Sequence, residues 1–592
     1  MDLPAFTTRP DLRGDFGMVA STHWLASATG MGVLERGGNA ADAAVAAGFV
    51  LQVVEPHLNG PGGEVPILLW DPAEEQVRVL AGQGVTPAAA TVSRFRDEGL
   101  DLVPGTGLLA ATVPGAVLAW LKLLQQWGSW RLGDVLEPAI SYAEHGVPVL
   151  PAISDTIAKV ADTFRADWPS SAATWLPHGH VPPPGSRLRN PALARTWRRL
   201  LDEIEQPGRT RDQEIDGARR VWRTGFIAEA IVAHVQHPVL DNSGERHAGV
   251  LAAGDLAEWD CPVEEPVSFD YHGYTVHKTG PWGQGPVFGQ QLSVLAGYDL
   301  GELGLLSPDY IHLITESAKL AFADREAWYG ADDTPLADLL DPAYAEQRRG
   351  LIGAQASTEL RPGSPGGRQP KLPTLPAETE PTGAGAGEPT VDARGATRGD
   401  TCQVDVADRW GMHISATPSG GWLQSSPVIA ELGFALGSRA QMTWLQEGFA
   451  STLRPRTRPR TTLSPSLATR DGRPYLAFGT PGGDQQDQWS VQFFLAHVHF
   501  GLSLQQAIDA PMFHSTHFPN SFWPRGRTPA GLVVESRISA ATLAELERRG
   551  HRLTRSGDWT LGRLSAVGPE PGTGFLRAAA NPRGMAGYAV GR

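Results

Sequence analysis

The sequence of 592 residues has little cysteine and few charged residues. Its two cysteines, Cys261 and Cys402, cannot build a disulfide framework or a cysteine-based zinc site. Charged residues make up 19% of the chain and the formal net charge is −14. A dedicated nucleic-acid-binding protein usually carries a basic face or a high pI, so the composition argues against a nucleic-acid partner.

The N-terminus lacks the features of a signal peptide, because acids and prolines stand where a positive start and an apolar run are needed. Residues 102–121 are free of charge, but they contain several prolines and glycines. This pattern favours a loop followed by a buried helix over a membrane span. We therefore expect a cytoplasmic protein without a membrane partner.

Signatures of nucleotide and metal sites are also missing. Neither GxGxxG nor GxxxxGK[ST] is present, which weakens a nucleotide-phosphate interpretation. His497 and His499 are two apart on a predicted helix and face different ways. His514 and His517 fall in a loop rich in Phe and Pro with no evident third ligand, so no metal site is expected.

Glycine and proline are abundant, with 68 and 48 residues, and 41% of the chain is hydrophobic, enough for a large core. The sharpest discontinuity lies between Gly353 and Thr397, where Gly and Pro are frequent and large aliphatic residues are rare. Such a stretch cannot bury enough surface to offset its ordering entropy. A flexible tail or linker is therefore predicted over residues 353–397.

Hydrophobic patterning predicts helices and strands on both sides of this stretch. Asn39 is the predicted N-cap of a buried helix over residues 40–54, which leads through a Gly-rich turn to a strand over 65–70. Further helices are expected from about residue 114 to 127 and after Ser307-Pro308. After the linker, alternation predicts a strand over 401–408 with Cys402, Val404 and Val406 on one face and Gln403 and Asp405 on the other.

The strand that opens at Thr401 is the first candidate site. A Thr hydroxyl is a poor nucleophile unless a base lies beside it, and a cut before the Thr would make its own α-amine that base. A Gly/Pro-rich segment ending at such a Thr has the arrangement this cut needs. A Thr at the start of a strand is nevertheless common without any chemistry.

Two loops are further candidates. Thr480-Pro-Gly-Gly-Asp484 lies between a predicted strand and a helix, where adjacent glycines can turn backbone N–H groups into a cavity and form an oxyanion hole. The alternative is an ordinary strand–helix turn. Residues 458–465 form a hydroxyl-rich loop that suits an acidic or amide substrate, or else a solvated turn.

In this order, the segments resemble the γ-glutamyltransferase family of N-terminal-nucleophile hydrolases. The resemblance covers nearly the whole chain except the linker, and it rests on GGNAADAAVA, EPHLNGPGGE, ATVPGAVLAW, ESAKLAFADREAWYG, RPRTTLSPSL, GTPGGDQQ and QQAIDAPMFH. It implies an α+β fold, a four-layer αββα sandwich, made as one inactive chain that cuts itself. The cut would separate a large subunit of residues 1–400 from a small subunit of residues 401–592 within one sandwich domain.

The resemblance also assigns roles to residues. It implies that Thr401 is the nucleophile and, through its amine, the base, with a small-molecule amide as substrate. The other matched positions are Ser419, which helps to activate the nucleophile, the oxyanion-hole glycines Gly482 and Gly483, and the substrate-binding pair Thr461 and Thr462. No metal or organic cofactor is needed, because the oxyanion hole and the terminal amine stabilise charge and transfer protons.

Four departures from the family pattern bear on processing and on the substrate, and the first two keep an unprocessed, non-catalytic homologue open. Gln403 and Asp405 replace a His and a Ser or Thr beside the nucleophile. The Arg that grips a glutamyl α-carboxylate aligns with Gln83, and the Asp that holds the α-amino group falls near Trp444. A buried charge without a partner is costly, so glutathione should bind poorly.

Three hypotheses follow. The leading one is a self-processing amidohydrolase or acyltransferase with altered acyl specificity. The second is a genuine γ-glutamyl hydrolase or transpeptidase in which Arg439, Gln441 or the threonine pair replaces the missing contacts. The third is an unprocessed, non-catalytic homologue. A minor variant, with Cys402 as the reactive group, is disfavoured by the position of the cut.

Overall fold

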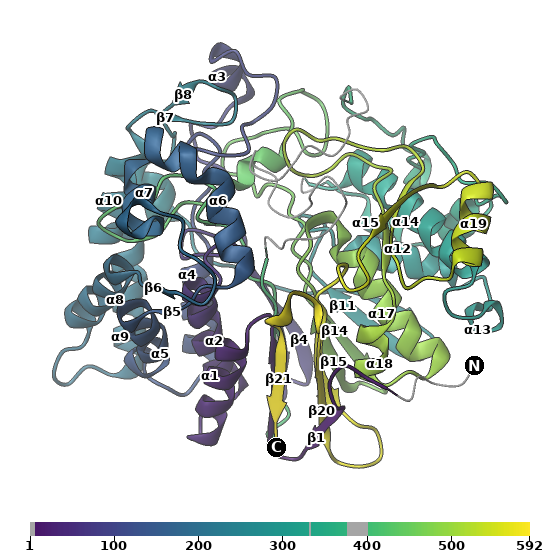
Figure 1. Cartoon of the computed structure of the whole chain (residues 1–592), viewed down its shortest axis with the longest axis horizontal. Helices are drawn as coiled ribbons and strands as arrows, with labels where there is room; N and C mark the ends of the chain where they lie inside the picture. The colour runs from purple at the N-terminus through teal and green to yellow at the C-terminus, as the bar shows by residue number, and fades with distance from the viewer. Residues whose placement is uncertain (1–5, 331–332, 376–400) are drawn as a thin grey trace.

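Two large antiparallel sheets form the centre of the molecule in the computed structural model, which describes residues 6–330, 333–375 and 401–592 (Figure 1). One sheet has the order β1 (Leu12–Gly14), β20 (Leu576–Ala580), β19 (Ser565–Pro569), β15 (Arg473–Gly479), β14 (Ser466–Arg470), β11 (Tyr274–Lys278) and β10 (Val267–Tyr271). The other has the order β21 (Tyr588–Gly591), β2 (Gly17–Ser21), β12 (Val404–Asp408), β13 (His413–Ala416), β3 (Val65–Asp71), β4 (Gln76–Gly82) and β9 (Val263–Glu264).

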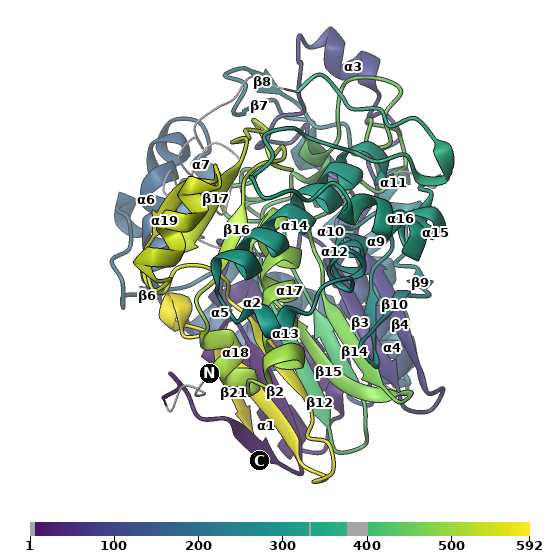
Figure 2. The ribbon, with the colours of Figure 1, turned by 90° about the vertical axis from the view of Figure 1, so that its right-hand side faces the viewer.

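Helices cover the outer face of each sheet, as Figures 1 and 2 show from two directions. The β2/β12 sheet packs against α1 (Trp24–Glu35), α2 (Ala40–Val54), α4 (Ala116–Trp127) and α5 (Leu132–His145) in one large apolar cluster. The β15/β19 sheet packs against α12 (Pro286–Leu295), α14 (Pro308–Trp328), α17 (Gln486–Phe500) and α18 (Leu504–Asp509) in a second cluster. The chain is therefore a mixed helix-and-sheet protein, as predicted.

The two sheets face each other, and the alternation of side chains along β2 shows how. Val19 points to the helices outside, whereas Met18 and Ala20 pack against Ala477 and Val567 of the opposite sheet. Successive side chains of a strand point to opposite faces, so each inner strand contributes to two cores. This explains why the central strands are buried along their whole length.

The remaining elements surround this centre. A small sheet of β16 (Phe513–Ser515), β17 (Gly531–Glu535) and β18 (Arg552–Ser556) carries α19 (Ala540–Arg548). The other helices are α3 (Val92–Asp97), α6 (Pro151–Ala166), α7 (Pro169–Trp175), α8 (Pro191–Ile204), α9 (Arg211–Thr224), α10 (Phe226–Val235), α11 (Ala253–Glu258), α13 (Leu300–Leu303), α15 (Leu336–Leu339) and α16 (Pro342–Arg349). Two short strand pairs are formed by β5 (Val147–Pro148) with β6 (Arg187–Leu188) and by β7 (Val239–Leu240) with β8 (Arg246–His247). The short 3-10 helices are η1 (Pro177–Gly179), η2 (Pro365–Gly367), η3 (Arg439–Met442), η4 (Gly483–Gln485) and η5 (Arg583–Met585).

Several predicted element boundaries are confirmed. Asn39 caps α2 with a capping box to Asp42, and Ser307 caps α14 with Pro308 at its first position. On β12, Val404 and Val406 face the helices, whereas the Gln403 and Asp405 side chains bond to groups on the other side. None of the helices in the described ranges is long and apolar enough to cross a membrane.

Residues 353–375, the first part of the predicted linker, are anchored by hydrogen bonds. Gly353 O accepts from His312, Ser357 O accepts from Lys319, and Gly363 N donates to Asp324. Composition alone predicts a flexible stretch here, but polar side chains of α14 supply partners for its backbone. Residues 376–397 of the predicted linker lie outside the described residues.

Candidate active site

Thr401 is fully buried at the approach to β12, and its hydroxyl faces another hydroxyl. Thr401 Oγ1 donates to Ser419 Oγ at 3.3 Å, and the two residues pair in an antiparallel bridge. The neighbouring Cys402 N donates to Pro418 O at 2.8 Å, which fixes the register. The structure thus brings together the predicted nucleophile and the predicted activating hydroxyl.

A buried ion pair lies on the far side of Ser419. Arg439 Nη2 donates to Ser419 Oγ at 3.0 Å, and Arg439 Nε donates to Glu64 Oε1 at 2.5 Å. The backbones of Glu64 and Ser419 also exchange two hydrogen bonds. A cation close to a hydroxyl favours its deprotonated form, and Arg439 is positioned to exert this effect on Ser419.

Sequence reasoning missed the role of Glu64, and it considered Arg439 only as a replacement contact for substrate. Glu64 and Arg439 are separated by 375 positions. The sequence offered only two weak signals, a Glu directly after the Gly-rich turn at residues 60–63 and an Arg shortly after Gly437. Nothing in the sequence indicates that these charges pair.

Gln403 and Asp405 complete each other's hydrogen bonds. Gln403 Nε2 donates to Asp405 Oδ1 at 2.7 Å and to Ser415 Oγ at 2.9 Å, and Gln403 Oε1 accepts from Thr417 Oγ1 at 2.7 Å. Ser565 Oγ donates to the second oxygen of Asp405 at 2.6 Å. Burial raises the pKa of Asp405 to about 7. The two departures from the family pattern therefore form one satisfied network behind the nucleophile.

Cys402 points away from this network, toward α2. Its Sγ donates to Glu55 Oε2 at 3.1 Å and accepts from Asn59 Nδ2 at 3.1 Å. Burial, and then the Glu55 carboxylate, raise the pKa of the thiol well above its ordinary value. The thiolate is the reactive form of cysteine, so this environment favours Thr401 over Cys402 as the nucleophile.

The loop after β15 has the backbone that adjacent glycines permit. Gly482 has φ 133° and Gly483 has φ 55°, and a Cβ on Gly482 would lie 2.3 Å from the Trp489 ring. Gln284 Nε2 donates to Gly483 O at 3.3 Å. Thr461 N donates to Trp282 O at 2.9 Å. The glycine loop and the loop of residues 458–465 therefore both contact the segment of residues 282–284.

The glycine loop lies at the same end of the sheets as Thr401. The Gln403 amide packs against the α-carbon side of Gly479, the last residue of β15, where a Cβ would meet it at 2.5 Å. Ser415 Oγ donates to Phe478 O at 3.1 Å. These contacts across the two sheets place the end of β15 beside the start of β12.

The predicted acyl-binding residues Gln83 and Trp444 are both fully buried. Within the described chain, no hydrogen-bond partner is found for either amide atom of Gln83, for Trp444 Nε1 or for Thr462 Oγ1. The Arg525 guanidinium stacks on the Trp444 ring at 4.1 Å. Burial lowers the pKa of Arg525 to about 9, which leaves it positive at neutral pH.

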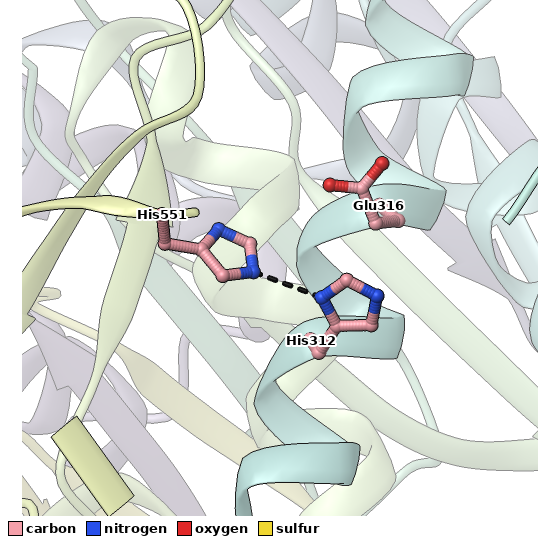
Figure 3. Close-up of side chains that lie close together, drawn as sticks. All are labelled: His312, Glu316 and His551. Atoms are coloured by element: carbon pink, nitrogen blue, oxygen red, sulfur yellow. Dashed lines mark hydrogen bonds between the residues drawn. The ribbon is translucent and has the colours of Figure 1, made fainter. Parts of the chain in front are cut away.

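One cluster with metal-ligand chemistry occurs in the described ranges, formed by His312, Glu316 and His551 (Figure 3). His312 Nε2 must carry a proton because it bonds to Gly353 O at 2.8 Å, so Nδ1 is left to accept from His551 Nε2 at 2.9 Å. Glu316 is bound by Lys319 at 2.5 Å and by Arg361 at 3.2 Å. Both ring nitrogens of His312 and the Glu316 carboxylate are therefore engaged with protein groups, and through Gly353 and Arg361 the cluster secures residues 353–361.

Comparison with known proteins identifies the family. A family model described as Gamma-glutamyltranspeptidase matches residues 26–591. The chain belongs to the gamma-glutamyltranspeptidase family. The Glutathione hydrolase-like YwrD proenzyme of Bacillus subtilis (strain 168) is 32% identical over 97% of this chain and 98% of its own length.

Two solved structures extend this likeness to the fold. "Structure of LmbA2991HD" is 56% identical, covers 99% of this chain and 100% of that one, and has a TM-score of 0.94. The cephalosporin acylase from Bacillus halodurans is 27% identical over 100% of this chain and 99% of its own, with a TM-score of 0.81. The chain is therefore an enzyme of the hydrolase class with the N-terminal-nucleophile type of fold.

Proposed function

We propose that this member of the gamma-glutamyltranspeptidase family is a self-processing amidohydrolase or acyltransferase whose nucleophile is Thr401. In this proposal, the two facing sheets and their outer helices form the four-layer αββα sandwich. The peptide bond between residues 400 and 401 is the processing site. One observation carries the proposal: the buried Thr401 hydroxyl bonds to Ser419 Oγ, which also accepts from Arg439.

The proposed chemistry runs through an acyl-enzyme. Cleavage before Thr401 frees its α-amine, which takes the proton of the Thr401 hydroxyl while the oxygen attacks the amide carbonyl. Backbone N–H groups of the Gly482–Gly483 loop stabilise the oxyanion. The α-amine then gives its proton to the leaving amine, and water or another amine releases the acyl group.

Charge near the predicted acyl pocket supports an acyl group without a positive charge. Gln83 and Trp444 carry no charge, the buried Arg525 guanidinium stacks on the Trp444 ring, and the buried Arg439 lies a few positions before Trp444 in the sequence. A substrate ammonium needs an anionic partner in a buried site, whereas here Trp444 is stacked on a guanidinium. This is the opposite of what an α-amino group requires.

The same contacts weigh against a genuine γ-glutamyl enzyme as the second candidate. Arg439 is occupied by Glu64 and Ser419. Gln441 donates to Gly105 O and Ser438 Oγ and accepts from Trp523 N. Neither replaces a missing glutamyl contact without giving up its own partner. The third candidate, a non-catalytic homologue, disagrees with the hydrolase relatives of this chain and leaves the Thr401–Ser419 pair without a chemical role.

Processing is tested by denaturing electrophoresis of the purified protein. Wild type should give two bands in the proportion of 400 to 192 residues, and Thr401→Ala should give one full-length band. Cys402→Ala is the matched control and should still be cut, because the thiol lies on the other face. An uncut wild type, or a cut Thr401→Ala protein, would contradict the proposal.

Acyl specificity is tested on the processed protein with a γ-glutamyl anilide and a panel of acyl anilides that lack the α-amino group. We expect kcat/KM for the best panel member to exceed that for the γ-glutamyl compound by at least about tenfold, on the order of 1.4 kcal/mol. Preference for the γ-glutamyl compound would instead support the second candidate.

A further inference from the structure

A cavity of about 330 Å³ lies behind the start of β12. Its walls come from the end of β2, the C-terminal end of α2, the start of α6 and the loops that precede β19 and follow β20. Of the residues placed above in the catalytic and acyl-binding machinery, none lines it. The cavity therefore needs an explanation of its own.

Three polar groups of the wall have no protein partner in the part of the chain that the structure describes. These are Arg563 through Nε and Nη2, Asn581 through Oδ1 and His57 through Nδ1. Asn581 is 1% exposed and His57 is 2% exposed, so bulk water does not readily replace a partner. Buried polar atoms are normally hydrogen-bonded, and such a concentration in one cavity points to a ligand.

Besides the exposed Asp155, the wall of the cavity carries one charge of each sign that has no ion pair among the described residues. Within the described ranges of the chain, Glu55 accepts only from the neutral donors Thr22 Oγ1, at 2.6 Å, and Cys402 Sγ, at 3.1 Å. No ion pair joins Glu55 to Arg563 in the described structure, although Arg563 is close enough to oppose the rise that burial causes in the pKa of Glu55. The other cation of the wall, Arg583, is already bound to Glu535 at 2.8 Å.

The remaining titratable groups do not change this balance. Burial, and then the positive charge of Arg563, lower the pKa of His57 to about 3, so its imidazole is neutral. Asp155 is exposed at the start of α6. A carboxylate suits the Arg563 fork, and an ammonium suits Glu55 together with Asn581 Oδ1.

We propose that this cavity binds a small zwitterion, an α-amino acid, with its carboxylate on Arg563 and its ammonium on Glu55 and Asn581. A zwitterion supplies both missing charges at once, whereas a simple anion would leave Glu55 unpaired and a simple cation would leave Arg563 unpaired. The proposal rests on contacts that are independent of acyl transfer.

The bound amino acid lies next to the catalytic machinery on two sides. Glu55 holds the Sγ of Cys402, the residue after Thr401, and Arg563 N donates to Thr480 Oγ1 at 3.0 Å at the start of the glycine loop. The cavity therefore lies beside the two segments that carry the proposed nucleophile and the proposed oxyanion hole.

The test is calorimetric titration of the Thr401→Ala protein with glycine, acetate and methylamine as separate probes. Using this variant removes acyl transfer, so the result is independent of whether the proposed function is correct. Glycine should bind at one site, and acetate and methylamine should each bind at least tenfold more weakly. Arg563→Gln and Glu55→Gln should each weaken glycine binding at least tenfold, and Arg563→Lys should weaken it less than Arg563→Gln.

Arg527→Gln is the matched control, because Arg527 Nε and Nη1 are also buried without a partner but the residue does not line the cavity. Its affinity for glycine should equal that of the parent. A crystal soaked in glycine should show the ligand between Arg563 and Glu55, which guards against misfolded variants. Undetectable glycine binding, equal binding of acetate, or an Arg563→Gln protein with unchanged affinity would each overturn the proposal.

Discussion

Thr401 gains its distinctive surroundings from residues that are remote in sequence. Ser419 lies opposite it, Arg439 lies behind Ser419, and Glu64 neutralises Arg439. A buried guanidinium is costly unless it is paired or multiply hydrogen-bonded. The pair therefore supplies a positive field at the hydroxyls without leaving an uncompensated charge in the core.

Asp405 should make the stability of the protein depend on pH. Its folded pKa of about 7 lies above the ordinary value of 3.8, mainly because of burial. The folded state therefore holds the proton more tightly, and this contribution is fully present below about pH 4 and lost as the pH rises through 7. Asp405→Asn should remove the dependence, which is worth on the order of 1–4 kcal/mol.

The measurement is urea unfolding of uncut Thr401→Ala protein at pH 5 and pH 8, with and without Asp405→Asn. The parent should lose more stability between these pH values than the double variant. Asp471→Asn, at an exposed turn, is the control and should change nothing. An identical pH dependence with and without Asp405→Asn would show that Asp405 is ionised throughout.

The elements position the site through their ends. β12 begins just after the proposed nucleophile, β15 ends just before the glycine loop, and Glu55 is the C-cap of α2. Catalytic and binding residues often lie on short loops that rigid strands and helices hold in place, and the ends of these elements hold the loops of this site in the same way. The Gly482–Gly483 turn depends on this support because its φ angles are positive.

Gly482→Ala should therefore damage both stability and activity. An Ala there would adopt φ near 133° and meet Trp489 at 2.3 Å, so we expect a loss of about 1–3 kcal/mol. Gly472→Ala is the matched control, since Gly472 also has positive φ but a Cβ there meets nothing within 4 Å. The midpoint temperature of thermal unfolding and kcat should both fall for Gly482→Ala. Gly472→Ala should lose some stability and keep its kcat. Full stability and full activity in Gly482→Ala would contradict the requirement for glycine at this turn.

At the scale of the molecule, both large sheets are built from the two predicted subunits. In one sheet β12 and β13 of the small subunit lie between β2 and β3 of the large one. In the other, β14 pairs with β11, and β20 pairs with β1. A cut at Thr401 breaks one peptide bond but none of these ladders.

The processed subunits should therefore remain one particle. In size-exclusion chromatography without denaturant, wild type should elute at the volume of uncut Thr401→Ala. Denaturing electrophoresis of the same peak should still show two bands. Two separate peaks under native conditions would show that the interleaved strands do not hold the subunits together.

The sequence by itself determined the local structure and the family. The caps Asn39 and Ser307, the alternation along β12 and the glycine pair after β15 depend on neighbours a few residues away, and such patterns can be read along the chain. Thr401 and Ser419 lie outside the quoted family motifs, and the resemblance assigns their roles only by position, so these roles stay predictions as well. The division into subunits and the substrate roles of Gln83 and Trp444 stay predictions.

Only the tertiary structure decided which distant groups meet. The pairing of Arg439 with Glu64, the bond from Cys402 to Glu55 and the anchoring of residues 353–375 on α14 all depend on how the layers pack. Chain spacing does not encode these contacts, because a buried charge takes whichever partner the fold places beside it. The unpaired Glu55 and Arg563 have the same origin: two layers bring them to one cavity but not to each other.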